Sequence, residues 1–512
     1  MANILDYIHW RGDLTFEERS FNEVDNLIFS EFAYLRLDRI LTNLWTDQPE
    51  RQRLLEDKTL FESVNRTGVK DRSTGEDNLE NQAQEGSQAQ AGETAPEAEE
   101  GKMDRSAWTV QDAPSNQTTL LDQDTPSDQD TPVSKTALKP GVDDPDYGAG
   151  ADIRAGADIL TIRDIVSRYE ELGYRQSELP NDPRDAGLAM AEAARYKDLL
   201  VSDYINIVDE AREIQFAAVT IHAPEFLYIA FRGTDNSIVG WREDFNFSYQ
   251  RETPAQGEAV TYMNYILKKY RAGVYLADRY RDRDSEKHPE RLSPVWMPEV
   301  YAGGHSKGGN LAIYAAAFCD PALQPLVTGV YSFDGPGFNH YITQTEAYQA
   351  ILPKVDLTIP ESSLIGILMS NTDAKKIVKC SAEGSNQHNP YTWLIERDHF
   401  EEARARSGSS VFLDGTINKW LDRLDDESKE RFVRIVFDVI DAAGAGTFAG
   451  LMDRKWESYN AILNAVRSMP ADDQKLVLKV IKELAIVSGD ALWNEARKSF
   501  EENHRKNREI LN

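Results

Sequence analysis

A serine lies in a glycine-rich segment whose spacing suits a nucleophile. Residues 301–316 have the sequence YAGGHSKGGNLAIYAA, in which Gly304, Ser306 and Gly308 fit the pattern G-x-S-x-G. In that pattern the serine occupies a sharp strand-to-helix turn, where small neighbours leave its hydroxyl exposed and let backbone N–H groups approach a substrate. A predicted strand, VWMPEVYAGG, precedes the serine, and a strongly helical run, GNLAIYAAAFC, follows it. This context predicts that Ser306 is a nucleophile and that His305, at the variable position, is a packing residue.

A serine hydroxyl is a poor nucleophile until a general base removes its proton, and the base needs a carboxylate that orients it. In hydrolases with this turn, the acid and then the histidine follow the serine along the chain. The histidines after Ser306 are His340, His388, His399 and His504. His388 lies in EGSNQHNPYTW, a loop of turn-forming residues after the last predicted strand, so we expect His388 to be the base.

Two residues compete for the role of the acid. Asp334, in VYSFDGPGF, ends the strand after the serine helix, and Glu361, in LTIPESSLIG, ends the next strand. An aspartate before a glycine is also typical of a turn, and a glutamate after a strand is also typical of a solvated side chain or a helix N-terminus. Asp334 is the preferred assignment, and Glu361 remains the alternative.

Ester hydrolysis also requires hydrogen-bond donors directed at the developing oxyanion. The backbone N–H of Lys307, directly after the serine, supplies one donor. We expect the second from YIAFRGTDNSIVGWREDF, where a predicted strand ends at Phe231 and Thr234 offers both an N–H and a hydroxyl. Asp244, in the same segment, is expected to hold that hydroxyl in place.

Strands and helices alternate around these residues. Two β-rich runs, 216–222 and 225–233, flank Ala223-Pro224 and predict a hairpin, and helical runs then alternate with short apolar strands. This alternation predicts an α/β fold with a mostly parallel sheet covered by helices on both faces. We assign 151–400 to this core and 1–64 to an N-terminal helical segment packed on it, with a helix from Phe21 to about Leu44.

Two regions differ from the core in composition. The stretch GEDNLENQAQEGSQAQAGETAPEAEEG is nearly devoid of large apolar side chains, and the tandem repeat DQDTP follows it, which predicts that 65–150 is a disordered acidic insertion. In 401–512, apolar residues recur at a spacing of three to four with charged residues between them, which predicts a C-terminal helical region.

The composition excludes several classes of protein. The formal net charge of −29 disfavours a general nucleic-acid binder, which needs a basic face. The chain has only two cysteines, Cys319 and Cys380, too few for a disulfide framework, and its first residues lack the apolar run of a signal peptide. No apolar run is long enough for a transmembrane segment, so we expect a cytoplasmic location. No metal-binding motif occurs, and we expect neither a metal nor a cofactor.

Several of these motifs together resemble a known family. FRGT, followed by Trp241 and Asp244 and then by GGHSKGGNLA, is similar to the class 3 (fungal-type) lipases of the α/β-hydrolase superfamily. The start ILDYIHWRGDLTF, with FDGPGF, IPESSLIGIL and QHNPYTW, more closely resembles a bacterial lipase-like branch, the Mbeg-like family. The resemblance covers about 1–45 and 160–440 and implies an α/β-hydrolase fold. It also implies that Ser306 is the nucleophile, His388 the base, and Thr234 and Lys307 the oxyanion hole.

The chain departs from the class 3 lipases at the acid. Those lipases have an N-D-x-V-P-like turn that supplies the acid, whereas this chain has IPESSLIG and no aspartate there.

The sequence therefore predicts a serine hydrolase that cleaves carboxylic esters, of lipids or of acyl-carrying small molecules. Transient contact with a membrane surface stays open, as does the protein partner of the acidic insertion. One alternative is a noncatalytic scaffold with this fold that binds a protein or lipid partner. The other is a thioesterase or peptidase on the same fold.

Overall fold

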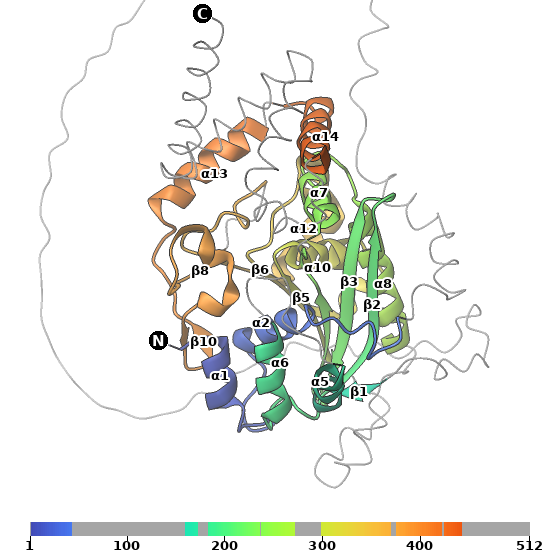
Figure 1. The fold of residues 1–512 in the computed structure, drawn as a ribbon, viewed down its shortest axis with the longest axis vertical. Helices are drawn as coiled ribbons and strands as arrows, with labels where there is room; N and C mark the ends of the chain where they lie inside the picture. The colour runs from blue at the N-terminus through green and yellow to red at the C-terminus, as the bar shows by residue number, and fades with distance from the viewer. Residues whose placement is uncertain are drawn as a thin grey trace, which may run out of the picture. The chain divides into compact units, whose positions relative to one another are not determined.

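A computed structural model describes residues 2–43, 159–172, 183–235, 237–271, 298–369, 375–421 and 424–442. The predicted disordered insertion, 65–150, lies outside the described residues, and so does the predicted C-terminal helical region beyond 442. Figure 1 shows the described elements with their labels.

Eight strands form one sheet, in which they follow one another in chain order. They are β1 (Leu160–Thr161), β2 (Leu200–Asp209), β3 (Ile214–His222), β4 (Phe226–Phe231), β5 (Glu299–His305), β6 (Val327–Phe333), β7 (Val355–Pro360) and β8 (Lys375–Val378). Strands β1 to β4 pair antiparallel, with β3 and β4 forming the predicted hairpin, and β4 to β8 pair parallel. The predicted α/β class with a mostly parallel sheet is confirmed.

Two sets of helices cover the sheet. One set is α1 (Ile4–Arg11), α2 (Glu23–Phe32), α5 (Ile162–Glu171) and α6 (Pro183–Glu192). The other is α8 (Pro254–Arg271), α10 (Lys307–Phe318), α11 (His340–Thr343) and α12 (Glu346–Ile351), and α7 (Ile238–Asn246) follows β4. A small second sheet pairs β9 (Ile395–Glu396) with β10 (His399–Phe400).

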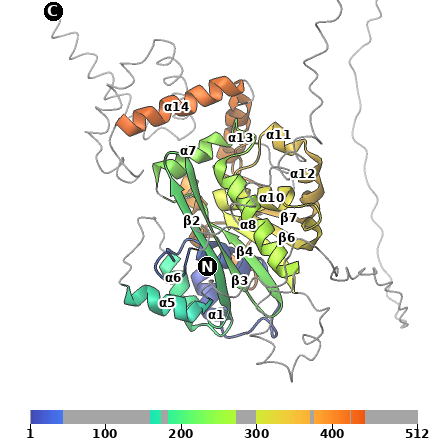
Figure 2. The same ribbon diagram turned by 90° about the vertical axis from the view of Figure 1, so that its right-hand side faces the viewer.

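The order of the strands decides which helices cover which face. Crossovers between parallel neighbours are right-handed, so strands that advance in one direction place their connecting helices on the same face. The helices α8, α10 and α12 accordingly share one hydrophobic cluster, which includes Leu227, Ile229 and Phe231 of β4. The intervening residues Phe226 and Tyr228 point to the opposite face, into a second cluster with α1, α2, α5 and α6. Figure 2 shows α8, α10 and α12 on one side of the strands.

Helix α2 is shorter than the predicted helix from Phe21 to Leu44. Its N-terminus is the predicted one: the Asn22 side chain accepts from the N–H groups of Val24 and Asp25, and the Asp25 side chain accepts from the Asn22 N–H. The helix ends at Phe32, and turns follow it as far as residue 41. Apolar spacing alone did not reveal this end because Leu35, Leu37, Ile40 and Leu41 are also buried.

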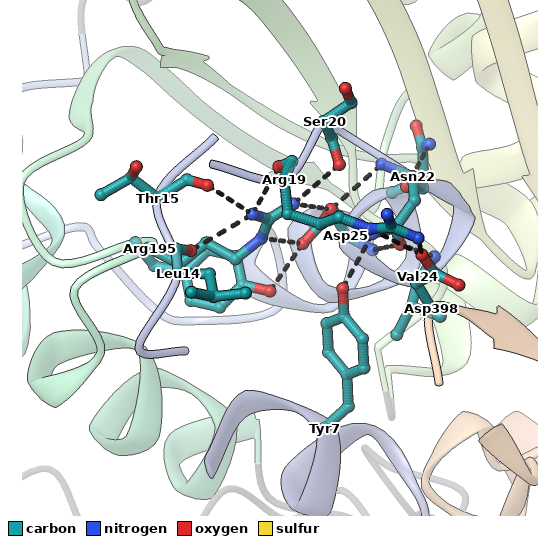
Figure 3. A network of polar contacts seen from close by, with 12 residues as sticks. Tyr7, Leu14, Thr15, Arg19, Ser20, Asn22, Val24, Asp25, Arg195 and Asp398 are labelled. Atoms are coloured by element: carbon teal, nitrogen blue, oxygen red, sulfur yellow. Dashed lines mark hydrogen bonds and ion pairs between the residues drawn. The ribbon is translucent and has the colours of Figure 1, made fainter. Parts of the chain in front are cut away.

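A buried ion pair fastens the N-terminal segment to the rest of the fold (Figure 3). The Arg195 guanidinium donates to both carboxylate oxygens of Asp25, at 2.8 and 2.6 Å, and both side chains are fully buried. It also donates to the carbonyl oxygens of Leu14, Thr15, Arg19 and Ser20. Burial by itself lowers the pKa of Arg195, but Asp25 raises it above its ordinary value, so the pair stays charged.

Two further helices, α13 (Gly408–Leu421) and α14 (Asp426–Ala442), belong to the predicted C-terminal helical region. The ring of Phe437 in α14 lies 5.7 Å from that of Phe245 in α7, with Arg242 over its face. Among the described residues no helix has the length and apolar content needed to cross a membrane.

We predict that Arg195→Met lowers the free energy of unfolding by about 3–5 kcal/mol, because it leaves the buried Asp25 carboxylate without the cation that balances its charge. The matched control is Arg184→Ala, which breaks the partly exposed ion pair with Glu170 and should cost about 1 kcal/mol or less. Urea denaturation followed by circular dichroism measures both. Equal losses in the two variants would contradict the role of the buried pair.

Candidate active site

Ser306 occupies a strained turn between β5 and α10. Its backbone has φ 57° and ψ −131°, a conformation that residues with a side chain rarely adopt. The turn is held by its neighbours: the Ser306 N–H donates to the Phe333 carbonyl at 2.8 Å, and the Gly309 N–H donates to the Ser306 carbonyl at 2.9 Å. The predicted position of the serine, after a strand and before a helix, is confirmed.

Two glycines make this turn possible. A Cβ on Gly304 would lie 2.3 Å from the carbonyl carbon of Gly308, and a Cβ on Gly308 would lie 2.1 Å from the carbonyl oxygen of Phe231. Both distances are far below van der Waals contact. The spacing G-x-S-x-G is therefore a packing requirement of the strand ends of β4 and β5.

His388 and Asp334 lie against each other. His388 ends a short 3-10 helix, η5 (Gly384–His388), and its Nδ1 lies 2.6 Å from Oδ2 of Asp334, the residue directly after β6. Because a carboxylate only accepts hydrogen bonds, Nδ1 carries a proton and a neutral ring leaves Nε2 as an acceptor. The Asp334 side chain is fully buried, whereas that of His388 is 30% exposed.

The Asp334 carboxylate has three donors. Besides His388, the Ser363 hydroxyl donates to Oδ1 at 2.5 Å and the Gly366 N–H donates to the same oxygen at 3.1 Å. Burial alone raises the pKa of Asp334, but the hydrogen bond and charge of His388 and the bond from Ser363 lower it below its ordinary value. The stability that these bonds contribute is present above the pKa of an unfolded aspartate and is lost as the pH falls through the lower folded value.

The other candidates lie elsewhere. Glu361 follows β7, and within the described residues no hydrogen bond joins its carboxylate to His388. His340 begins α11, where its ring lies against that of Tyr341, with centroids 3.9 Å apart and the ring planes tilted by 40°. His399 is in β10 with a half-exposed side chain. His504 lies outside the described residues.

The two residues proposed from the segment after β4 are in contact. The Thr234 hydroxyl donates to Oδ2 of Asp244 in α7 at 2.5 Å, as the sequence predicted. Within the described ranges, no group hydrogen-bonds to Oδ1 of Asp244, which is buried. Burial raises the pKa of Asp244 to about 7, with Glu243 and Asp235 adding to the rise and Lys307 and Thr234 opposing it.

The side chain of Lys307 has a structural role that the sequence did not reveal. Its Nζ is fully buried and lies 2.6 Å from Oε2 of Glu243 and 2.8 Å from the carbonyl oxygen of Gln215, to which it donates. Glu243 also accepts from the N–H groups of Gln215 and Ala255. This buried pair joins the start of α10 to β3, α7 and α8. The sequence contains two adjacent acidic residues in WREDF, Glu243 and Asp244, and a role was predicted only for Asp244.

His305 is buried, as predicted for a packing residue, but it also makes polar contacts. Its ring lies between Glu31, at the end of α2, and the backbone of His388. Glu31 and Tyr34, which also contacts His305, carry no motif and did not stand out in the sequence.

A cavity of about 390 Å³ lies beside α13. Its walls include apolar side chains of β7 and β8 and several basic side chains. The lining residues are Ser248, Phe338, Asn339, His340, Ile359, Ile367, Met369, Lys375, Ile377, Arg406, Asp414, Asn418, Leu421 and Lys429. Neither Ser306 nor His388 lines it, so this cavity does not define the group that the serine would attack.

We predict that Gly308→Ala lowers the free energy of unfolding by about 1–3 kcal/mol or more, because the new methyl group must displace the end of β4. Gly415→Ala is the matched control. A Cβ on Gly415, in α13, meets nothing within 4 Å, and alanine should raise the stability by about 0.5–1 kcal/mol. Thermal and urea denaturation of the two variants measures the difference, and a neutral Gly308→Ala would contradict the packing requirement.

Comparison with known proteins bears on residues 190–438, which match the model of a family described as Mbeg1-like. No curated protein matches the chain. The matched residues contain Thr234, Ser306, Asp334 and His388, whereas α1 and α2 lie before them. Over residues 190–438, the chain is thus similar to the Mbeg1-like family.

Proposed function

We propose that the protein is a serine hydrolase with an α/β-hydrolase fold that cleaves carboxylic esters of lipids or acyl-carrying small molecules. The observation that carries this proposal is the 2.6 Å contact between His388 and the buried Asp334, beside the strand end that holds Ser306. The match to the Mbeg1-like family agrees with a lipase-like role.

In the proposed reaction the Ser306 hydroxyl attacks the ester carbonyl while Nε2 of His388 takes its proton. Asp334 stabilises the resulting imidazolium through Nδ1. The negative charge on the carbonyl oxygen would be met by the Lys307 N–H and by Thr234. His388 then gives the proton to the leaving alkoxide, and a water molecule activated by the same imidazole hydrolyses the acyl-serine.

The strain at Ser306 favours catalysis over a noncatalytic scaffold. A residue with a side chain in such a conformation costs on the order of 1–3 kcal/mol, which a glycine would avoid. A serine at φ 57° is expected where its hydroxyl is used. A thioesterase or peptidase would use the same residues, and the choice of substrate separates these activities.

We further propose a cytoplasmic location. Both cysteines, Cys319 and Cys380, are free thiols. Burial raises the pKa of each to about 12, so neither is poised to react. Unpaired and inert cysteines suit a reducing compartment.

Ser306→Ala and His388→Ala should each reduce the hydrolysis of p-nitrophenyl esters on the order of 10³-fold or more, by similar factors. A series of acyl chain lengths ranks the substrates, and labelling by a fluorophosphonate probes Ser306 without a choice of substrate. If the wild type is no faster than Ser306→Ala on any ester and is not labelled, the proposed activity is wrong.

Asp334→Asn should lower kcat on the order of 10³–10⁴-fold, because the amide no longer holds His388 in the required tautomer. Glu361→Gln is the matched control and should leave kcat within about twofold, since surface substitutions away from a site have small effects. Steady-state kinetics of the two variants at constant pH decides which of the two carboxylates is the acid. A large loss in Glu361→Gln with little loss in Asp334→Asn would reverse the assignment of the acid.

A further inference from the structure

His305 lies between two acceptors. It is the last residue of β5, directly before Ser306, and is 7% exposed. Its Nε2 lies 2.9 Å from the carbonyl oxygen of His388, and its Nδ1 lies 3.1 Å from Oε1 of Glu31. The rings of His305 and His388 are 4.7 Å apart between centroids.

Neither acceptor offers a proton of its own. A carbonyl oxygen only accepts, and so does a carboxylate, so a neutral imidazole could donate to one of the two and would turn a lone pair toward the other. Only an imidazolium presents N–H groups to both. The protonated ring thus matches both contacts.

The environment of Glu31 supports the same protonation state. Glu31 is 5% exposed, and the contact of its buried Oε1 with Nδ1 of His305 is an ion-pair contact at 3.1 Å; among the described residues no group makes a well-aligned hydrogen bond to this oxygen. A buried carboxylate in this position needs a neighbouring cation, and the ring of His305 is the group in ion-pair contact with it.

In the part of the chain that the structure describes, four titratable groups surround the His305 ring. Glu31 approaches from α2, Asp334 from the end of β6, and His388 from η5. The Tyr34 hydroxyl lies 3.5 Å from Nδ1 and donates to the carbonyl of His305 itself at 3.3 Å. Burial lowers the pKa of His305, but Glu31, Asp334 and the His388 carbonyl raise it, and the net direction is upward.

We propose that His305 is a positioning residue: as an imidazolium paired with Glu31, it holds the main-chain carbonyl of His388 and so fixes the loop that carries the base. This inference rests on the proposed function for its catalytic meaning. It assigns part of the site to α2, which lies before the residues that match the Mbeg1-like family. The segment before the acidic insertion then completes the active site as well as covering the sheet.

The test compares two variants of adjacent buried residues in α2. Glu31→Gln keeps the shape of the side chain and removes its charge. Ser30→Ala is the control, because Ser30 bonds to the Asn26 carbonyl and to Tyr228 in the sheet and has no contact with His305 among its hydrogen bonds. Both should lower the Tm. Only Glu31→Gln should reduce kcat, by about 10–100-fold with KM nearly unchanged, because a small displacement of a catalytic group has effects of this size.

The pH profile separates positioning from a general loss of stability. An imidazolium with a raised pKa is present at low pH and is lost as the pH rises through that value. The rate of fluorophosphonate labelling should therefore fall on the alkaline side in the wild type, and this fall should move to lower pH in Glu31→Gln but not in Ser30→Ala. Equal effects of the two variants on kcat and on the profile would overturn the proposal.

A readout without turnover keeps the two proposals distinguishable. In protein labelled with ¹⁵N-histidine, both ring nitrogens of His305 should carry protons at neutral pH, and Glu31→Gln should remove one proton and shift the ring signals of His388. If the wild type neither hydrolyses esters nor is labelled, the proposed function fails, while these signals still decide whether Glu31 and His305 control His388. A neutral His305 ring in the wild type, or unchanged His388 signals in Glu31→Gln, would overturn the inference.

Discussion

The handedness of the crossovers is the constraint on which the rest of the structure depends. Strands β4 to β8 advance across the sheet in one direction, so α8, α10 and α12 cover the same face. The opposite face carries Phe226, Tyr228 and other large side chains that water would otherwise reach. Helices α1, α2, α5 and α6 cover it, and residues 2–43 are for this reason part of the core.

The same parallel arrangement gathers the polar residues at one edge of the sheet. Thr234 follows β4, Ser306 follows β5, and Asp334 follows β6, so all three come from the carboxyl ends of neighbouring strands. One buried charge pair and one buried carboxylate–imidazole contact support this edge from different sides. Lys307 and Glu243 join α10 to β3 and α7, and Glu31 and His305 join α2 to the end of β5.

Local signals predicted much of this arrangement. The glycine spacing around Ser306, the hairpin of β3 and β4, and the cap of α2 at Asn22 each depend on a few adjacent residues. The sequence favoured Asp334 over Glu361 but left Glu361 open, because the choice depends on which strand end the His388 loop approaches. The role of Glu31 could not be predicted at all, since it depends on contacts with residues far along the chain. The end of α2 at Phe32 was missed because the turns after it are as apolar as the helix.

The pair of Arg195 and Asp25 joins residues that stand on either side of a long intervening stretch of chain. Asp25 and the carbonyl groups of residues 14–20 come before that stretch, and Arg195 comes after it. Noncovalent contacts therefore join these two pieces in addition to the peptide chain between them. A protease that cuts between residues 43 and 159 would leave α1 and α2 anchored by a buried charge pair and by the aromatic side chains packed around it, so the two fragments would persist as one complex.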